Sequence, residues 1–197
     1  MTYADKILNM VRNNNGAVTT SQVTSADISR EHLYSLVDKK VLERSARGVY
    51  ILPDVFDDEM YNLQTRFKRG VFSHETALYL FDLTDVTPDQ YTMTFPLGYN
   101  TSRLKRANIH YYRTKKEFYE LGVTTVKSYG GHDVQVYNME RTLCDILRTR
   151  SQSDIRDITD AFKMYTRLKS KNIPLLTRYA KIFHVDKKIR SYLEVLL

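Results

Sequence analysis

The sequence predicts an α+β fold divided into two domains. Three short amphipathic segments with helix-capping residues come first, and a pair of strand-like segments around a glycine turn follows them. After Pro53 the composition changes to an acidic run, and helical and alternating patterns both recur. The 197 residues are enough to bury a core without disulfides. We therefore predict domains at residues 1–53 and 54–197.

The first two predicted helices lie within residues 3–26. In the first, over residues 3–13, Ile7, Leu8 and Val11 share one face, and the Asn13–Gly16 segment ends the helix. The second begins at a capping box, in which the Thr19 hydroxyl and the Gln22 amide are three residues apart, and it runs to about residue 26.

A third helix is predicted over residues 30–39, with Ser29 as its N-cap and Ile28 packed against Leu33 as a hydrophobic staple. The helical spacing buries Leu33 together with Leu36 and Val37. The outward face is then polar; it carries Glu31, Ser35 and Asp38, flanked by His32, Tyr34 and Lys39.

Two short strands, residues 41–44 and 49–52, are predicted around a turn that carries Arg47 and Gly48. Three helices followed by a hairpin is the order of a winged helix-turn-helix, whose third helix enters the DNA major groove while the hairpin wing touches the backbone or the minor groove. The basic wing favours DNA over the alternative of a docking module for a partner protein. Glu31 and Asp38 weigh against DNA, although Glu31 could accept a hydrogen bond from a cytosine amino group.

The C-terminal domain is predicted to be mixed α+β, with a small sheet and a helical C-terminus. A helix with Met60, Leu63 and Phe67 opens it, and Ser73 is expected to cap a helix over residues 75–81. The alternating patterns predict strands at 91–95 and 108–113 and a hairpin of 124–129 with 133–137. The remaining helices are expected at about 139–149, 153–170, 174–183 and 186–196.

Composition excludes several classes. One cysteine, Cys144, rules out an internal disulfide framework and a multi-cysteine zinc site. The start lacks the features of a signal peptide, and no apolar run approaches the ~18 residues of a membrane span, so a soluble, cytoplasmic protein without a membrane partner is expected. The net charge of +7 indicates polyanionic partners.

The motif search predicts no enzyme. There is no glycine-rich phosphate loop, no His-Glu-x-x-His and no Gly-x-Ser-x-Gly, and Pro88-Asp89 lacks the Glu-x-Lys partner of a nuclease. The five histidines have no metal-ligand spacing and are interpreted as capping, surface or packing residues. Cys144 is interpreted as a buried, inert thiol. No catalytic residue, metal or cofactor is therefore predicted.

Basic clusters in the second domain are the remaining candidates. Arg103, Lys105 and Arg106 could make auxiliary contacts with DNA or with a partner, or could be plain surface. The helical face of Arg156, Lys163 and Arg167 also contains Asp160 and is interpreted as a solvated, self-paired surface.

Three segments together resemble the AbiEi family of antitoxins from bacterial abortive-infection systems. They are Glu43–Tyr50, then Ser73–Leu80 with Leu83-Thr84-Asp85 and Pro88 after it, and Val136–Asp145. Their order and spacing extend the resemblance over nearly the whole chain. We interpret the second and third segments as core and capping elements, with Leu78, Leu143 and Cys144 buried.

The resemblance implies an antitoxin of type IV, which opposes a nucleotidyltransferase-fold toxin without a stable complex and represses its own operon at inverted repeats. Two copies are expected on each operator, because inverted repeats need two winged helices. The residues predicted to contact promoter DNA are Thr20, Ser21 and Gln22 for phosphates, Arg30, His32, Tyr34, Ser35 and Lys39 for the groove, and Arg44 and Arg47 for the wing. The alternatives are a DNA-targeted nuclease or nucleotide-modifying enzyme and a ligand-sensing transcription regulator.

Overall fold

The computed structural model describes residues 2–104, 106–148 and 153–196. The chain forms two compact units. The N-terminal unit combines Met1–Lys68 with Val126–Val134, and the C-terminal unit combines Arg69–Thr125 with Gln135–Leu197. Residues 54–68 thus fold together with the first fifty residues, while the functional boundary at residue 53 stays a prediction.

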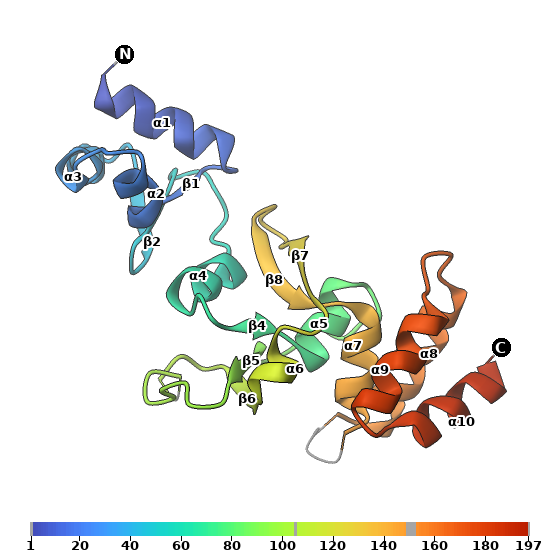
Figure 1. Cartoon of the computed structure of the whole chain (residues 1–197). Coiled ribbons are helices and arrows are strands. Elements are labelled where there is room, and N and C mark those ends of the chain that lie inside the picture. The colour runs from blue at the N-terminus through green and yellow to red at the C-terminus, as the bar shows by residue number, and fades with distance from the viewer. Residues whose placement is uncertain (1, 105, 149–152, 197) are drawn as a thin grey trace. The chain divides into compact units, whose positions relative to one another are not determined.

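The N-terminal unit contains four helices and a three-stranded antiparallel sheet in the order β1-β3-β2 within its described residues (Figure 1). Its elements up to residue 68 are α1 (Tyr3–Asn13), β1 (Ala17–Thr19), α2 (Thr20–Ser25), α3 (Arg30–Asp38), β2 (Glu43–Ala46), β3 (Val49–Ile51) and α4 (Glu59–Arg66). The three predicted helices and the hairpin are confirmed.

Helix caps form where the sequence places them. Gln22 Oε1 accepts from Thr19 N at 2.7 Å, and Gln22 N donates to Thr19 Oγ1 at 3.1 Å, which completes the predicted capping box. Ser29 Oγ accepts from Glu31 N at the start of α3. The core beneath the helices consists of Ile7, Val11, Val18, Val23, Ile28, Leu33, Leu36, Leu42 and Tyr50.

Residues 126–134 join the N-terminal unit from far along the sequence. They are the tip of the predicted hairpin, formed by β7 (Val123–Lys127) and β8 (Asp133–Tyr137). Asn15 Nδ2 donates to Gly131 O at 2.7 Å, and Asp58 accepts from Ser128 Oγ. The tip thereby contacts the segment after α1 and the N-cap of α4.

The C-terminal unit is built on a mixed sheet in the order β6-β5-β4-β8-β7. Strand β5 is antiparallel to β4 and parallel to β6, and β4 is parallel to β8 with Phe72 opposite Val136. Besides β7 and β8, its elements are β4 (Val71–Phe72), α5 (His74–Leu80), β5 (Thr92–Pro96), β6 (His110–Thr114), α6 (Lys116–Tyr119), α7 (Met139–Ile146), α8 (Ile155–Arg167), α9 (Ile173–Ile182) and α10 (Asp186–Leu196).

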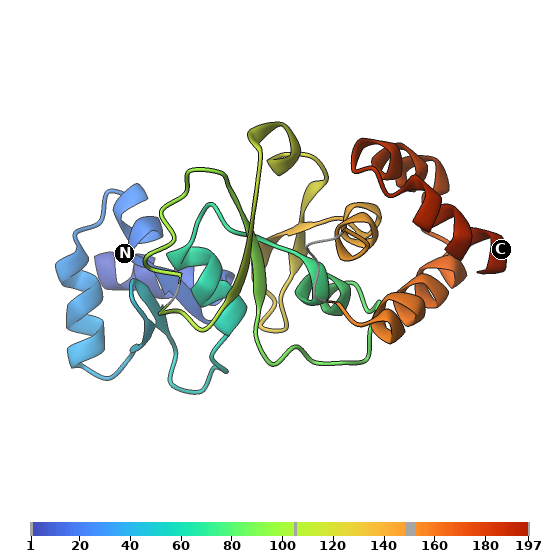
Figure 2. The same ribbon diagram turned by 90° about the horizontal axis from the view of Figure 1, so that it is seen from below.

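Helix α7 is the centre of this unit's helical part. It contacts α5, α8 and α9, and Figure 2 shows it between the sheet and the helices α8–α10. Leu78, Leu143 and Cys144 are buried in the shared core, as predicted. The helix predicted over 139–149 ends at Ile146 and the one predicted over 153–170 covers Ile155–Arg167, while residues 149–152 lie outside the described residues.

One predicted cap is wrong. Ser73 occupies the N-cap position of α5, but its side chain makes no capping hydrogen bond. Its hydroxyl accepts instead from Thr94 Oγ1 at 2.8 Å and lies 3.1 Å from His74 Nδ1. Because Ser73 is fully buried beside β5, the neighbouring hydroxyl and imidazole take the place of the helix backbone as its partners.

Candidate nucleic-acid interface

An open groove of about 480 Å³ lies between helix α3 and the β2–β3 wing. It is lined by Thr20, Arg30, Tyr34, Val37, Asp38, Arg44, Arg47, Gly48 and Tyr50. Five of the ten predicted DNA-contact residues line it, namely Thr20, Arg30, Tyr34, Arg44 and Arg47. The structure therefore brings residues from α2, α3 and the wing to one surface.

The wing turn is fixed against the start of helix α2. Thr20 N donates to Gly48 O at 3.0 Å, so the turn is tied to the N-terminus of α2. Gly48 has a φ of +82°, and a Cβ there would lie 3.1 Å from Thr20 Oγ1. Glycine thus suits both the left-handed backbone and the close approach of the hydroxyl.

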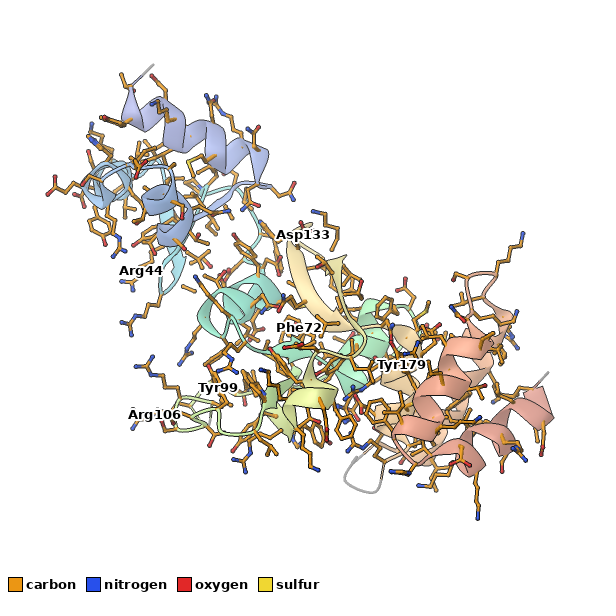
Figure 3. All side chains as sticks on the ribbon, in the orientation of Figure 1. Arg44, Phe72, Tyr99, Arg106, Asp133 and Tyr179 are labelled. Carbon is orange, nitrogen blue, oxygen red and sulfur yellow. The ribbon has the colours of Figure 1, made fainter. Side chains whose placement is uncertain are left out.

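The groove contains three guanidinium groups and one carboxylate. Arg30 Nε donates to Thr24 Oγ1 at 3.2 Å, and Arg44 Nε donates to Ala46 O at 3.4 Å. Figure 3 shows Arg44 on the wing. Within the described residues, no salt bridge pairs Arg30, Arg44 or Arg47 with a carboxylate. Each guanidinium keeps donors for an external anion, since arginine carries five N–H groups.

Tyr34 and Tyr50 form the aromatic part of the groove. Their ring centroids lie 6.4 Å apart, and burial, together with the neighbouring Tyr34, raises the pKa of the Tyr50 phenol. Tyr50 belongs to the core, whereas Tyr34 is 45% exposed. Tyr34 is accordingly the phenol of this pair that an incoming ligand can reach.

The other five predicted residues are placed around the groove without lining it. Gln22 uses its amide oxygen in the capping box, and the His32 ring stacks on Tyr3 with centroids 4.8 Å apart. Ser21 Oγ accepts from Lys68 Nζ at 3.5 Å. Ser35 is half-buried, and Lys39 is exposed at the C-cap of α3. Their role in DNA contact remains a prediction.

The stripe of α3 that faces the wing differs in part from the predicted outward face. Arg30, Tyr34, Val37 and Asp38 follow the spacing i, i+4, i+7 and i+8, which is one helical face. The predicted outward face contained Asp38, which lines the groove, but also Glu31 and Ser35, which do not. Val37 was predicted to be buried and instead lines the groove.

The auxiliary basic cluster lies in the loop between β5 and β6. Arg103 and Arg106 are exposed, while Leu104 between them is fully buried and anchors the loop. Tyr99 and Arg106 are labelled in Figure 3. The Tyr99 ring stacks on Phe95 with centroids 4.6 Å apart. Lys105 lies outside the described residues. A contact of this loop with DNA or with a partner stays a prediction.

The described residues offer little to metal or nucleophilic chemistry. Among them, no group of three histidine, cysteine, aspartate or glutamate side chains could hold a metal ion. Burial strongly raises the pKa of the Cys144 thiol, which disfavours the reactive thiolate. In the described part of the chain no helix is long and apolar enough to cross a membrane.

The helices, the three-stranded sheet and the basic groove define a winged helix-turn-helix unit of the kind that transcriptional regulators use. Residues 5–53 match the family model described as "Transcriptional regulator, AbiEi antitoxin", which confirms the resemblance over this region.

The longer span has a structural relative. The crystal structure of the RV2827C protein from Mycobacterium tuberculosis aligns with 92% of this chain and 72% of its own, at 13% identity and a TM-score of 0.56. At this identity the likeness shows a shared fold. The comparison with curated proteins gives no match.

Proposed function

We propose that this protein is an antitoxin of a bacterial abortive-infection system that represses its own operon by binding inverted repeats in its promoter. The DNA-binding part of this proposal rests on the protein groove that is lined by Arg30, Arg44 and Arg47. The family match over residues 5–53 supports the same role. The protein acts in the cytoplasm and needs no catalysis of its own.

The protein groove between α3 and the wing suits the phosphate backbone of a duplex. When a third helix lies in the major groove and a wing reaches the backbone, one DNA strand runs between them. Three guanidinium groups against the single Asp38 carboxylate give this groove a net positive charge. Phosphate contacts of this kind position the protein, while Tyr34 and Ser35 on α3 are left to read base edges.

The number of chains on the operator follows from symmetry. An inverted repeat presents the same half-site twice, related by a twofold axis, so two N-terminal units bind one operator. The exposed loop with Arg103 and Arg106 is available for auxiliary contacts with the DNA or with the second copy.

The proposed DNA binding is tested by a salt-titrated binding curve on the DNA immediately upstream of the gene. A scrambled duplex of equal length is the control. We expect clear preference for the upstream duplex, with a salt dependence that reflects the phosphate contacts. Equal and steeply salt-dependent binding to both duplexes would reduce the groove to a nonspecific basic surface.

The antitoxin half is assigned to the C-terminal unit, and its counterpart is a nucleotidyltransferase-fold toxin. The assignment of the antitoxin activity to this unit is supported by the segments Ser73–Leu80 and Val136–Asp145, which lie in it and carry part of the family resemblance. Co-expression with the toxin should restore growth, while an affinity-tagged antitoxin should not retain the toxin. Retention of the toxin in an amount near that of the tagged protein would exclude an action without a stable complex.

A further inference from the structure

A small pocket in the C-terminal unit brings together residues that the DNA interface does not use. Its volume is about 50 Å³, and its lining is His74, Thr94, Tyr112, Arg113, Thr114, Arg141, Asp145 and Arg148. These residues come from α5, β5, β6 and α7 with the turn that follows α7. Two of the motif segments noted in the sequence, one with His74 and one with Arg141 and Asp145, thus meet at one place.

The charges in this pocket do not balance. Asp145 accepts from Arg141 Nε at 2.7 Å and from Arg148 Nη1 at 3.3 Å, so one carboxylate serves two guanidinium groups. Arg113 is a third cation, on β6, and within the described residues no salt bridge joins it to a carboxylate. The four charged groups of the lining therefore leave a positive excess.

Arg141 is held rigidly. Its Nη1 donates to Phe118 O at 2.7 Å and to Leu121 O at 3.2 Å, and its guanidinium lies over the Tyr137 and Phe183 rings at 4.5 and 4.0 Å. The side chain is 1% exposed. A buried cation fixed in this way forms a preorganised wall of the pocket, because its orientation does not depend on a ligand.

His74 forms another wall in a backbone conformation that few residues adopt. Its φ is +50°, and its ring stacks on Tyr112 with centroids 3.8 Å apart and planes at 17°. Burial lowers the pKa of His74, with Arg141 and Arg148 acting in the same direction and Asp145 and Glu75 opposing them. A buried side chain held at positive φ by its surroundings is a feature that clusters at binding sites.

The neutral part of the lining can hydrogen-bond an anion. The Thr114 hydroxyl can donate to an anion, whereas the Thr94 hydroxyl donates its one proton to Ser73 Oγ. A volume of about 50 Å³ holds a few water molecules at roughly 10–15 Å³ each. That is the scale of one tetrahedral oxyanion and too small for a nucleoside.

We propose that this pocket binds one phosphate-type oxyanion, with Arg113 and Arg148 at its accessible side and Arg141 as its fixed wall. Planar guanidinium forks and hydroxyl groups are the donors that phosphate groups prefer. The anion is either free phosphate or the terminal phosphate group of a nucleotide whose remainder stays outside the pocket. The site is independent of the wing groove, and it makes the C-terminal unit a receptor for an anionic effector.

The test is calorimetric titration of the full chain with inorganic phosphate, at constant ionic strength maintained with sodium chloride. Arg113→Gln and Arg148→Gln should each weaken phosphate binding about tenfold, the loss of one charge-assisted contact. Arg156→Gln, an exposed arginine on α8, is the matched control and should leave the affinity unchanged. Circular dichroism melting curves check that each variant is folded.

Arg47→Gln separates this site from the wing groove, which also gathers three arginines. Phosphate binding that survives Arg47→Gln and is lost in Arg113→Gln places the anion in the C-terminal unit, whereas the reverse pattern overturns the proposal.

A nucleoside triphosphate is the second ligand. Tighter binding of the triphosphate than of phosphate, with the same variant pattern, identifies a nucleotide as the source, and equal or weaker binding identifies free phosphate. Absence of binding by both ligands refutes the site without affecting the DNA-binding proposal.

Discussion

His132 Nδ1 lies 2.7 Å from Asp58 Oδ2, and both side chains are buried although the residues are 74 positions apart in the sequence. The His132 ring also stacks on Tyr61 with centroids 4.2 Å apart, and its Nε2 lies 3.2 Å from Asn14 O. This cluster connects the β7–β8 hairpin tip to the segment after α1 and to the start of α4 within the N-terminal unit.

Asp58 should make the unit sensitive to acid. Burial by itself would raise the pKa of Asp58, but hydrogen bonds from His132, Ser128 and the Tyr61 amide outweigh it and hold that pKa below its ordinary value. A carboxylate whose pKa is lowered by folding stabilises the protein above the pKa of the unfolded chain, about 3.9, and loses that contribution as the pH falls below it. The melting temperature should therefore drop more steeply below about pH 4 in the wild type than in Asp58→Asn.

The same substitution tests the strength of the buried pair at neutral pH. Asp58→Asn should lower the free energy of unfolding by roughly 1–3 kcal/mol, because the buried hydrogen bonds between Asp58 and its partners Ser128 and His132 are weakened or lost. Asp133→Asn is the control; its pair with Lys127 at 2.8 Å is 65% exposed on both sides and should contribute under about 1 kcal/mol. Chemical denaturation measures the free energy of unfolding of both variants. Equal losses would contradict the larger stabilising role given to Asp58.

Arg47→Gln should weaken binding to every duplex. The wing guanidinium is assigned to a phosphate, so its removal should lower affinity uniformly and reduce the slope of log affinity against log salt by about one. Arg12→Gln, an exposed arginine in the last turn of α1, should change neither value. An unchanged slope in Arg47→Gln would remove the wing from the interface.

Asp38→Asn should have the opposite effect. Asp38 is the one carboxylate in the groove lining, and it repels a phosphate there. Its neutralisation should strengthen DNA binding by about 1 kcal/mol, or roughly fivefold, at low salt. Asp54→Asn, exposed in the same unit, is the control. If both variants gain equally, the gain reflects net charge instead of position in the groove.

Tyr34→Phe and Ser35→Ala should alter sequence preference more than overall affinity. Both residues lie on α3, and their hydroxyl groups can donate to and accept from base edges. Binding to a library of single-base operator variants measures the preference. A uniform loss across the library would reassign these side chains to the backbone.

Cys144 should resist alkylation in the folded protein. Its side chain is fully buried, and burial raises the pKa of its thiol, so little thiolate is present or accessible at pH 8. Iodoacetamide should label it quickly in guanidinium chloride and very slowly under native conditions, as followed by mass spectrometry. Fast native labelling would mean that α7 opens readily.

Local signals were enough to predict most of the helices. The Thr19–Gln22 capping box and the Ser29 cap act between near neighbours, so the sequence alone reveals them. Strands β1 and β4, with three and two residues, were missed because pairing with β3 and with β5 and β8 defines them, and no alternation can show in so few residues.

The candidate sites were predictable to different degrees. The wing arginines were found because a basic turn is a local feature, and Arg30 and Tyr34 were also among the predicted contacts. Val37 was not, because the stripe of α3 that faces the wing depends on how the helix packs. The pocket of Arg113, Arg141 and His74 was not predicted at all. These residues are separated by 28 positions or more and meet only through β5–β6 pairing and the packing of α5 on α7.

The N-terminal unit is discontinuous, and this sets an order on its folding during synthesis. The ribosome completes Lys68 well before it reaches Val134, and at 5–20 residues per second the interval is roughly 3–13 s. Throughout this interval Asp58 lacks both Ser128 and His132, so the nascent N-terminal unit is without these contacts at the start of α4. Only chains translated past the hairpin can complete this unit, so a finished N-terminal unit is a sign that about two thirds of the chain has been made.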